Sequence, residues 1–320
     1  ADHIDGRLEK GSAKSTNELP RLNENDIILY HLAIGTDLNL KMLEMPGKKI
    51  IRYHNITPPE FFEGYSDRLV QLCRDGLIQV AGMTARFHHL LSVSEFNRSC
   101  LSEMGYQGDS AVAPIMIPFE DYRKEPDETI IEKYGKDDIV NFVFVGRLVP
   151  NKTQEDIIKI FYYYKKYYNN NARLFLVGAC GEMDLYEYQL KKYVKELGVE
   201  DVYFTGHVSF PAILAYYKVA DVLLCTSRHE GFCIPLVEAM FFDVPIIAFD
   251  SSAIGETLGG SGCLLKQRNC LEAAALADRI VNNSEFKNFV IEGQRKRLQD
   301  FSNDKVFDIM INYINKVAQE

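Results

Sequence analysis

The sequence has no apolar run of the roughly 20 residues that a bilayer-spanning helix needs. Its apolar stretches, such as residues 139–145 and 221–225, are interrupted within a few positions. Basic residues are not in excess either, because 36 Lys and Arg stand against 45 Asp and Glu, for a net charge of −9. The N-terminus shows no charged and apolar leader. We therefore expect a soluble protein that binds no nucleic acid and has at most peripheral contact with a membrane.

Paired cysteines and metal-binding spacings are also absent. The seven cysteines include no C-x-x-C pair and several lie in apolar runs, which favours reduced thiols in a cytoplasm. The histidines show no H-x-x-H or H-x3-H spacing, and no two aspartates are separated by a single residue. These absences predict a protein that needs no cofactor and no metal ion.

What is present is an alternation of short β-branched runs with longer segments of helical periodicity, from residue 26 onward. This pattern predicts an α/β fold, and 320 residues are enough for two domains, each a doubly wound, Rossmann-like parallel sheet. Strands are expected near residues 27–33, 49–54, 90–94, 111–117, 140–145, 173–177, 202–205, 222–226 and 245–249. Helices are expected near residues 36–45, 66–85, 95–104, 154–169, 183–197, 210–219 and 236–242.

A proline-flecked, charged segment at residues 118–138 interrupts the alternation, as an interdomain linker does. We therefore predict a first domain at residues 1–122, a second at 123–302 and a final helix within 303–320.

The first motif that can carry chemistry is FVFVGRLVPNK, residues 142–152. Gly146 ends a buried strand, and Arg147 and Lys152 follow on the loop that opens a helix. In a doubly wound sheet, ligands bind outside the carboxyl ends of the strands, and two cations beside a helix N-terminus suit a diphosphate. The alternative is a pair of solvated charges near an N-cap made by Thr153 with Asp156.

The second motif is HEGFCIPLVEAM, residues 229–240. Glu230 lies on a loop after a strand, and Glu238 lies about one turn inside the following helix. The backbone N–H groups of residues 231–233 are available to an anion, and nearby carboxylates can accept hydrogen bonds from sugar hydroxyls. The alternative makes Glu238 a charge that complements the helix dipole and Glu230 an ordinary loop carboxylate.

Together, the E-x7-E pattern at Glu230 and Glu238 and the G-R-x4-K pattern at Gly146–Lys152 resemble retaining glycosyltransferases of family four, which have the GT-B fold. The resemblance also includes LSVSEFNRSCLSEMGY (91–106), LVGACGE (176–182) and VYFTGHVS (202–209), and it covers most of residues 26–320. It implies that the final helix crosses back onto the first domain.

The resemblance also implies roles for individual residues. Arg147 and Lys152 are expected to hold the donor diphosphate, Glu238 the ribose hydroxyls and Glu230 the hydroxyls of the transferred sugar. The full set implied to bind the donor is Gly146, Gly206, His207, Val208, Gly231, Phe232, Cys233, Ile234 and Glu238.

His54, in IIRYHNITPPEFF, follows a strand of the first domain and is expected to face the same cleft. Members of the family carry a histidine at the end of a comparable strand, where it contacts the transferred sugar, so we group His54 with Arg147, Lys152 and Glu230 as catalytic candidates. Asn55 and Thr57 are weaker candidates beside it.

The sequence departs from the family pattern in two ways. We find neither a first strand nor its glycine-rich loop before Ile27, so we expect the first domain to be truncated at its N-terminus. Cys233 stands where glycine is frequent in the family, and we expect its small side chain to fit.

The resemblance predicts transfer of a hexose of the mannose or glucose type from a nucleotide diphosphate sugar to a hydroxyl of a glycan or lipid-linked acceptor. Such a reaction belongs to the synthesis of surface polysaccharides or other glycans, in the cytoplasm or at the inner face of its membrane. Two alternatives stay open, a glycosyltransferase-like binding subunit without catalysis and a nucleotide-sugar epimerase of the same fold.

Overall fold

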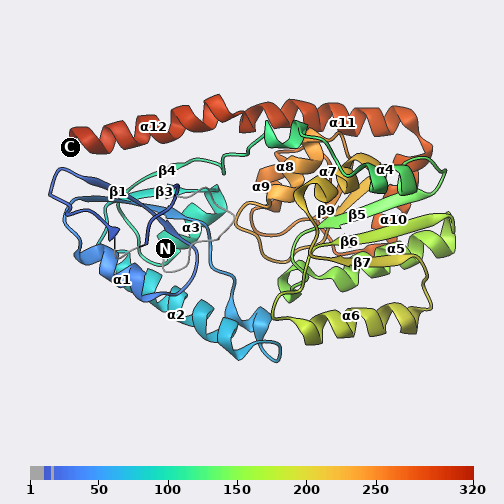
Figure 1. The fold of residues 1–320 in the computed structure, drawn as a ribbon, viewed down its shortest axis with the longest axis horizontal. Helices are drawn as coiled ribbons and strands as arrows, with labels where there is room; N and C mark the ends of the chain where they lie inside the picture. Colours follow the sequence, from blue (N-terminus) through green and yellow to red (C-terminus); the bar gives the residue numbers. More distant parts are fainter. Residues whose placement is uncertain (1–10, 16–17) are drawn as a thin grey trace.

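A computed structural model of the chain describes residues 11–15 and 18–320. Within these residues the strands form two sheets in which every pairing between strands is parallel. The first sheet has the order β1-β2-β3-β4, and the second has the order β10-β9-β8-β5-β6-β7. Helices flank both sheets (Figure 1). The predicted α/β fold with two parallel sheets is confirmed.

The first sheet and its helices occupy the described chain up to Val112. The elements are β1 (Ile27–Leu32), α1 (Asp37–Glu44), β2 (Lys48–Tyr53), η2 (Pro59–Phe62), α2 (Asp67–Met83), β3 (His89–Ser92), α3 (Glu95–Glu103) and β4 (Asp109–Val112). Thr36, Ser66 and Ser94 are the N-caps of α1, α2 and α3, and each side chain accepts a hydrogen bond from a first-turn N–H group. The strand expected at residues 111–117 is wrong in its bounds, because Pro114 has no N–H to continue the ladder.

The second sheet begins after a segment that is more ordered than a linker. Residues 118–138 hold η3 (Asp121–Arg123), with a buried Tyr122, and α4 (Glu128–Tyr134), which packs on α7. The elements that follow are β5 (Val140–Val145), η4 (Pro150–Lys152), α5 (Gln154–Tyr167), β6 (Ala172–Val177), α6 (Asp184–Leu197), β7 (Val202–Gly206), α7 (Phe210–Val219), β8 (Val222–Cys225), α8 (Ile234–Phe241), β9 (Ile246–Phe249), α9 (Ile254–Leu258), β10 (Cys263–Leu265), α10 (Cys270–Asn282), α11 (Ser284–Leu298), η5 (Gln299–Phe301) and α12 (Asn303–Gln319). The sequence patterns missed α9 and β10, which are only five and three residues long.

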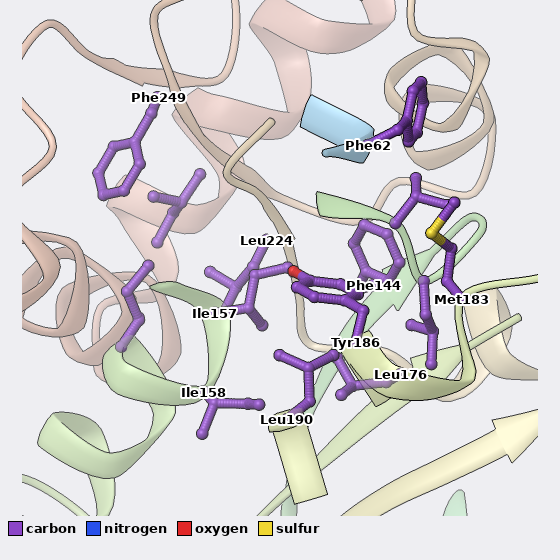
Figure 2. Close-up of a cluster of buried hydrophobic side chains, with 14 of the residues drawn as sticks. Phe62, Phe144, Ile157, Ile158, Leu176, Met183, Tyr186, Leu190, Leu224 and Phe249 are labelled. Atoms are coloured by element: carbon purple, nitrogen blue, oxygen red, sulfur yellow. The ribbon is translucent and has the colours of Figure 1, made fainter. Parts of the chain in front are cut away.

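Both faces of the second sheet are buried, which explains its almost continuous apolar strands. In β5, Phe142 and Phe144 point to the face covered by α5, α6 and α10, whereas Val143 points to the face covered by α7 and α8. The apolar cluster that contains Phe142 and Phe144 also includes Phe62 from η2. Figure 2 shows the Phe62 ring near Phe144 and Met183. One of the apolar clusters is therefore shared by the two sheets.

The last helix ties the two halves together. Helix α12 runs back from the second sheet to the first, as the family resemblance implies (Figure 1). Its buried Tyr313 and Val317 pack on Ile50 and Leu91 of the first sheet. The hydroxyl of Tyr313 donates to the carbonyl oxygen of Asp109 at 2.9 Å and accepts from the N–H of Leu90 at 3.2 Å.

The predicted absence of a first strand and glycine-rich loop falls partly on residues 1–10 and 16–17, which lie outside the described residues. Residues 11–15 and 18–26 contain no strand. The truncation and the exact domain limits stay predictions.

Replacing Tyr313 with Phe keeps the ring and removes both hydrogen bonds of the hydroxyl group. The buried N–H of Leu90 then has no acceptor, which costs about 1–3 kcal/mol. We expect the Tyr313→Phe protein to unfold at a lower urea concentration, measured by circular dichroism. The matched change Tyr167→Phe, at a side chain that is 55% exposed on α5, should leave the midpoint unchanged. Equal midpoints for the two variants would show that the Tyr313 hydroxyl does not hold α12.

Candidate active site between the two sheets

A cavity of about 280 Å³ lies where the carboxyl ends of the two sheets face each other. His54 reaches it from the loop after β2, Arg147 from the loop after β5 and Glu230 from the loop after β8. Lys152, at the end of η4, lines the same cavity. The four residues grouped from the sequence as catalytic candidates are thus brought together, at the edge where doubly wound sheets bind ligands.

Lys152 and Glu230 form an ion pair that is almost withdrawn from water, with side chains 17% and 10% exposed. Burial is the largest influence on the pKa of Lys152 and acts to lower it. The charge and hydrogen bond of Glu230, together with the thiols of Cys233 and Cys225, act in the opposite direction, and in sum the pKa is raised. Ser227 donates a second hydrogen bond to the same carboxylate, and the Glu230 N–H donates to the hydroxyl of Ser252. The alternative left open by the sequence, that Glu230 is an ordinary loop carboxylate, is therefore wrong.

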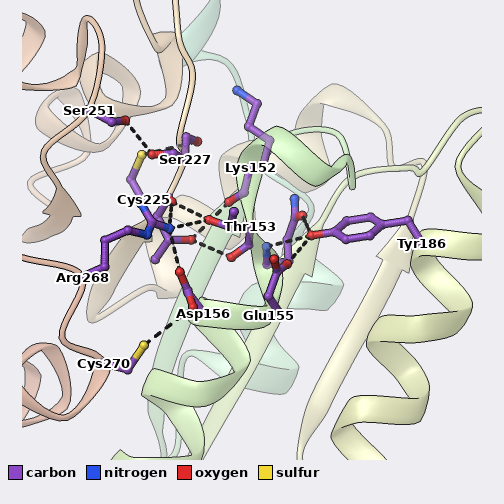
Figure 3. A network of polar contacts seen from close by, with 12 residues as sticks. Lys152, Thr153, Glu155, Asp156, Tyr186, Cys225, Ser227, Ser251, Arg268 and Cys270 are labelled. Atoms are coloured by element: carbon purple, nitrogen blue, oxygen red, sulfur yellow. Dashed lines mark hydrogen bonds and ion pairs between the residues drawn. The ribbon is translucent and has the colours of Figure 1, made fainter. Parts of the chain in front are cut away.

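Arg268 holds the loop that carries Lys152. The sequence patterns did not identify this arginine as part of the site. Thr153 has a φ of 48°, in the left-handed region that a β-branched residue rarely adopts. Arg268 donates to the hydroxyl of Thr153 at 2.7 Å and to Asp156 at 2.6 Å (Figure 3). The Thr153 hydroxyl donates to the carbonyl oxygen of Thr226 and does not cap α5. Thr153 therefore occupies the N-cap position of α5, as expected from the sequence, but the side-chain capping hydrogen bond that this expectation implied is absent.

His54 is half-buried and stacks on His31, with ring centroids 5.0 Å apart. Its Nε2 atom lies 2.8 Å from Nδ1 of His31. Burial, and then the charges of His31 and Arg52, lower the pKa of His54 to about 4. The ring is therefore neutral at pH 7 and suited to hydrogen bonding rather than to charge pairing.

Residues 231–233 connect Glu230 to α8. Gly231 lines the cavity, whereas Phe232 and Cys233 are buried beside it. No described group accepts a hydrogen bond from the N–H groups of Gly231, Phe232 or Cys233. Cys233 has a φ of 77° and its Sγ lies 3.8 Å from Sγ of Cys225, so its side chain fits in a buried site despite the left-handed backbone. Ile234 is half-buried and begins α8.

Gly231 is required by the close approach of the two halves. A Cβ atom at this position would lie 2.5 Å from the carbonyl oxygen of His54 and 2.9 Å from Cβ of Asn55. The glycine therefore lets the loop of the second sheet touch the loop of the first.

Of the predicted donor-binding residues, only Gly231 lines this cavity, and two groups of the others lie farther from Glu230 along the chain. Glu238 lies in α8 behind it, where its carboxylate accepts hydrogen bonds from Tyr122 at 2.7 Å and Tyr217 at 2.6 Å. Burial raises the pKa of Glu238, although both phenol hydrogen bonds act to lower it. The second group follows or ends β7 and comprises Gly206, an exposed His207 and a half-buried Val208. Gly146 directly follows β5, beside the cavity-lining Arg147, and its N–H donates to the carbonyl of Val177 at 2.9 Å.

Sequence reasoning also missed His229, although it directly precedes Glu230. The Nε2 atom of His229 lies 2.8 Å from Oδ1 of Asn55, across the boundary between the halves. Asn55 in turn donates to Asn97 at 2.7 Å. Asn55 and Thr57, the weaker sequence candidates, both line the cavity. The sequence did carry a signal for His229, namely its position directly beside the motif carboxylate of Glu230.

Among the described residues, no group of three or more His, Cys, Asp or Glu is arranged to hold a metal ion. Independence of metal ions stays a prediction. In the same part of the chain, no helix combines the length and apolar character that crossing a membrane demands.

Two facing parallel α/β units with a cavity between their carboxyl ends define the GT-B class of fold. Solved structures with this fold resemble the chain closely. Sucrose-phosphate synthase from Thermosynechococcus elongatus has a TM-score of 0.74 at 17% identity, with 91% of this chain and 74% of that chain covered. HepE from Anabaena, solved with UDP-glucose, has a TM-score of 0.69 at 20% identity, with 86% and 73% covered.

The family model for glycosyl transferases group 1 matches residues 126–297, more than half of the chain. The chain belongs to this family. Among curated proteins it is similar to the O-antigen chain mannosyltransferase RfbU of Salmonella typhimurium, with 30% identity over 174 residues, 54% of this chain and 45% of that protein. The chain spans about half the length of the curated relatives it matches.

Replacing Gly231 with Ala should push the two halves apart at their closest contact. Overpacking of this kind costs about 1–3 kcal/mol, so we expect the melting temperature to fall by several degrees. Amides of residues 53–57 should exchange with deuterium faster, because their packing partner is displaced. The control Gly82→Ala, in α2, adds a Cβ with no atom within 4 Å and should not lower stability. Unchanged exchange at residues 53–57 in Gly231→Ala would contradict this role.

Proposed function

We propose that the chain transfers a hexose from a nucleotide diphosphate sugar to a hydroxyl group of a glycan or lipid-linked acceptor, with retention of the anomeric configuration. The observation that carries the proposal is the single cavity lined by Arg147, Lys152 and Glu230 from one sheet and His54 from the other. Its charges suit an anion, because two cations face one carboxylate. The two histidines that line it add no charge at pH 7, since burial lowers the pKa of each.

The donor diphosphate would bind beside Arg147, Lys152 and the free N–H groups of residues 231–233. The bond from the anomeric carbon to the phosphate oxygen breaks, and the bond to the acceptor oxygen forms on the same face. The acceptor proton passes to the departing phosphate oxygen, so no protein nucleophile is needed. Preorganised cations and N–H groups stabilise the charge that develops on that oxygen.

Glu230 and Glu238 would then bind different parts of the donor. Glu230 lines the cavity and would accept hydrogen bonds from the transferred sugar. Glu238 has two carboxylate oxygens, each with one phenol donor and one remaining lone pair for a ribose hydroxyl. Tyr122 and Tyr217 would thus orient Glu238 rather than block it.

The mannose or glucose type of donor is supported by two names among the similar proteins. RfbU is a mannosyltransferase, and HepE was solved with UDP-glucose. We place the reaction in the synthesis of a surface polysaccharide or other glycan, in the cytoplasm or at the inner face of its membrane, without a metal ion.

The two rival functions make different products. An epimerase converts the donor without an acceptor, whereas a binding subunit releases no nucleoside diphosphate under any condition. A turnover assay with and without acceptor therefore separates all three functions.

Replacing Arg147 with Ala should lower the rate of sugar transfer at least about a hundredfold, comparable to removing one preorganised donor from an oxyanion site. Arg147 is exposed, so the fold should be unaffected. A thermal-shift panel of GDP, UDP, ADP and their hexose conjugates, with EDTA present, identifies the nucleotide first. The matched change Arg123→Ala, at an exposed arginine outside the cavity, should leave transfer unchanged. A loss of less than tenfold in Arg147→Ala would remove its assigned role.

Replacing Glu238 with Gln should weaken binding of the nucleoside diphosphate about tenfold, because charge-assisted hydrogen bonds to ribose are lost. Isothermal titration should show no such loss for the 2′,3′-dideoxy analogue, which lacks both hydroxyls. The control Glu120→Gln, at a side chain that is 80% exposed, should bind both nucleotides as the parent does. Equal weakening toward both nucleotides would mean that Glu238 acts on the fold and not on ribose.

A further inference from the structure

His31, Arg52 and His54 lie together at the carboxyl end of the first sheet. The register of β1 and β2 pairs His31 with Arg52, so their side chains share one face. Alternation along the chain places His54, two residues after Arg52, on that face too. The contact of 2.8 Å between His31 Nδ1 and His54 Nε2 is the result.

This contact uses one of the two nitrogens on the His54 ring. No described group forms a hydrogen bond with the other nitrogen, Nδ1. Because His54 lines the cavity, Nδ1 is the ring nitrogen left for a substrate. The hydrogen bond and the stacked rings together restrict rotation of the His54 side chain.

Burial first, and the surrounding charges second, keep both rings neutral. Burial, and next the charge of Arg52, lower the pKa of His31 as well. Arg52 is 2% exposed, and its NH2 group donates to the carbonyls of Ala113 and Pro114. The other titratable groups that line the cavity are Cys73, Arg147, Lys152, His229 and Glu230.

Two neutral imidazoles can share a hydrogen bond only if one donates and the other accepts. The tautomer with its proton on Nε2 is the commoner one of free histidine. If both rings adopt it, His54 donates from Nε2 to Nδ1 of His31. Nδ1 of His54 then offers a lone pair to the cavity, as an acceptor for a hydroxyl group.

We propose that His31 is a positioning residue for sugar transfer, which holds His54 in one orientation and in the Nε2–H tautomer so that Nδ1 accepts a hydrogen bond from a hydroxyl of the transferred hexose. The proposal rests on the proposed function for its substrate. His31 contributes no atom to the reaction and acts through His54.

The test compares the parent with His31→Phe, which retains an aromatic ring and removes the hydrogen bond. One side of His31 packs on His54 while much of the residue is open to solvent, so this change should not disturb folding. Long-range ¹H–¹⁵N spectra of the imidazole rings should show one tautomer of His54 in the parent and a mixture in His31→Phe. This measurement of the His54 tautomer requires no turnover, so it tests the pairing of the two rings even if the chain transfers no sugar.

Kinetics give the second readout. We expect kcat/KM for transfer to fall about tenfold in His31→Phe. Removing His31 also removes one of the causes that lower the pKa of His54, so that pKa rises. Because activity requires a neutral His54, acidification should abolish the activity of His31→Phe at a higher pH than that of the parent. A merely structural role of His31 would not move this limb of the pH profile.

Two further variants complete the design. His31→Gln should restore much of the activity, because its amide oxygen can accept from Nε2 of His54. His88→Phe is the matched control, since His88 is exposed just before β3, at the opposite end of the sheet. A His54 tautomer that is mixed in the parent, or unchanged in His31→Phe, would overturn the proposal. A fixed tautomer in a parent that transfers no sugar would overturn the proposed function while keeping the pairing of the two rings.

Discussion

The ion pair between Lys152 and Glu230 organises the site. Each partner is largely withdrawn from water, so neither charge is stable there without the other. The pair joins the loop after β5 to the loop after β8, two strands that are neighbours in the sheet. The ammonium group of Lys152 has three N–H donors, and a single carboxylate does not use all of them. The pair therefore fixes a cation at the cavity wall while leaving it able to contact an anion.

The second constraint is the close contact between the halves. The loop after β8 touches the loop after β2 through Gly231, and His229 bonds to Asn55 across the same boundary. On the far side of the first sheet, α12 packs through Tyr313 and Val317. The cavity is thus built from loops, but each loop is held by a sheet, a neighbouring loop or the returning helix.

Much of this arrangement could be predicted from the sequence, because it depends on local patterns. Apolar strands followed by glycine and cations placed Arg147 and Lys152 at a strand's carboxyl end, and the resemblance to a known family added His54 and Glu230. The contacts that were missed join residues far apart in the chain. Arg268 supports Thr153 from 115 positions away, and no local spacing announces such a contact. The strand limit at Val112 was missed because the apolar pattern continues past Pro114, where the hydrogen-bond ladder cannot.

The two motif carboxylates show how one sequence pattern can serve two environments. Seven residues separate Glu230 from Glu238, yet the first pairs with an ammonium group and the second with two phenols. An ammonium partner neutralises its carboxylate, whereas a phenol only donates to it. Burial therefore acts on Glu238 without a compensating charge, and its pKa rises. Glu230 is thereby suited to a site shared with a diphosphate, and Glu238 to neutral hydroxyl donors. The same reasoning applies to His31 and His54, because two uncharged rings in contact can orient one another without adding charge to a cavity for which we propose an anionic donor.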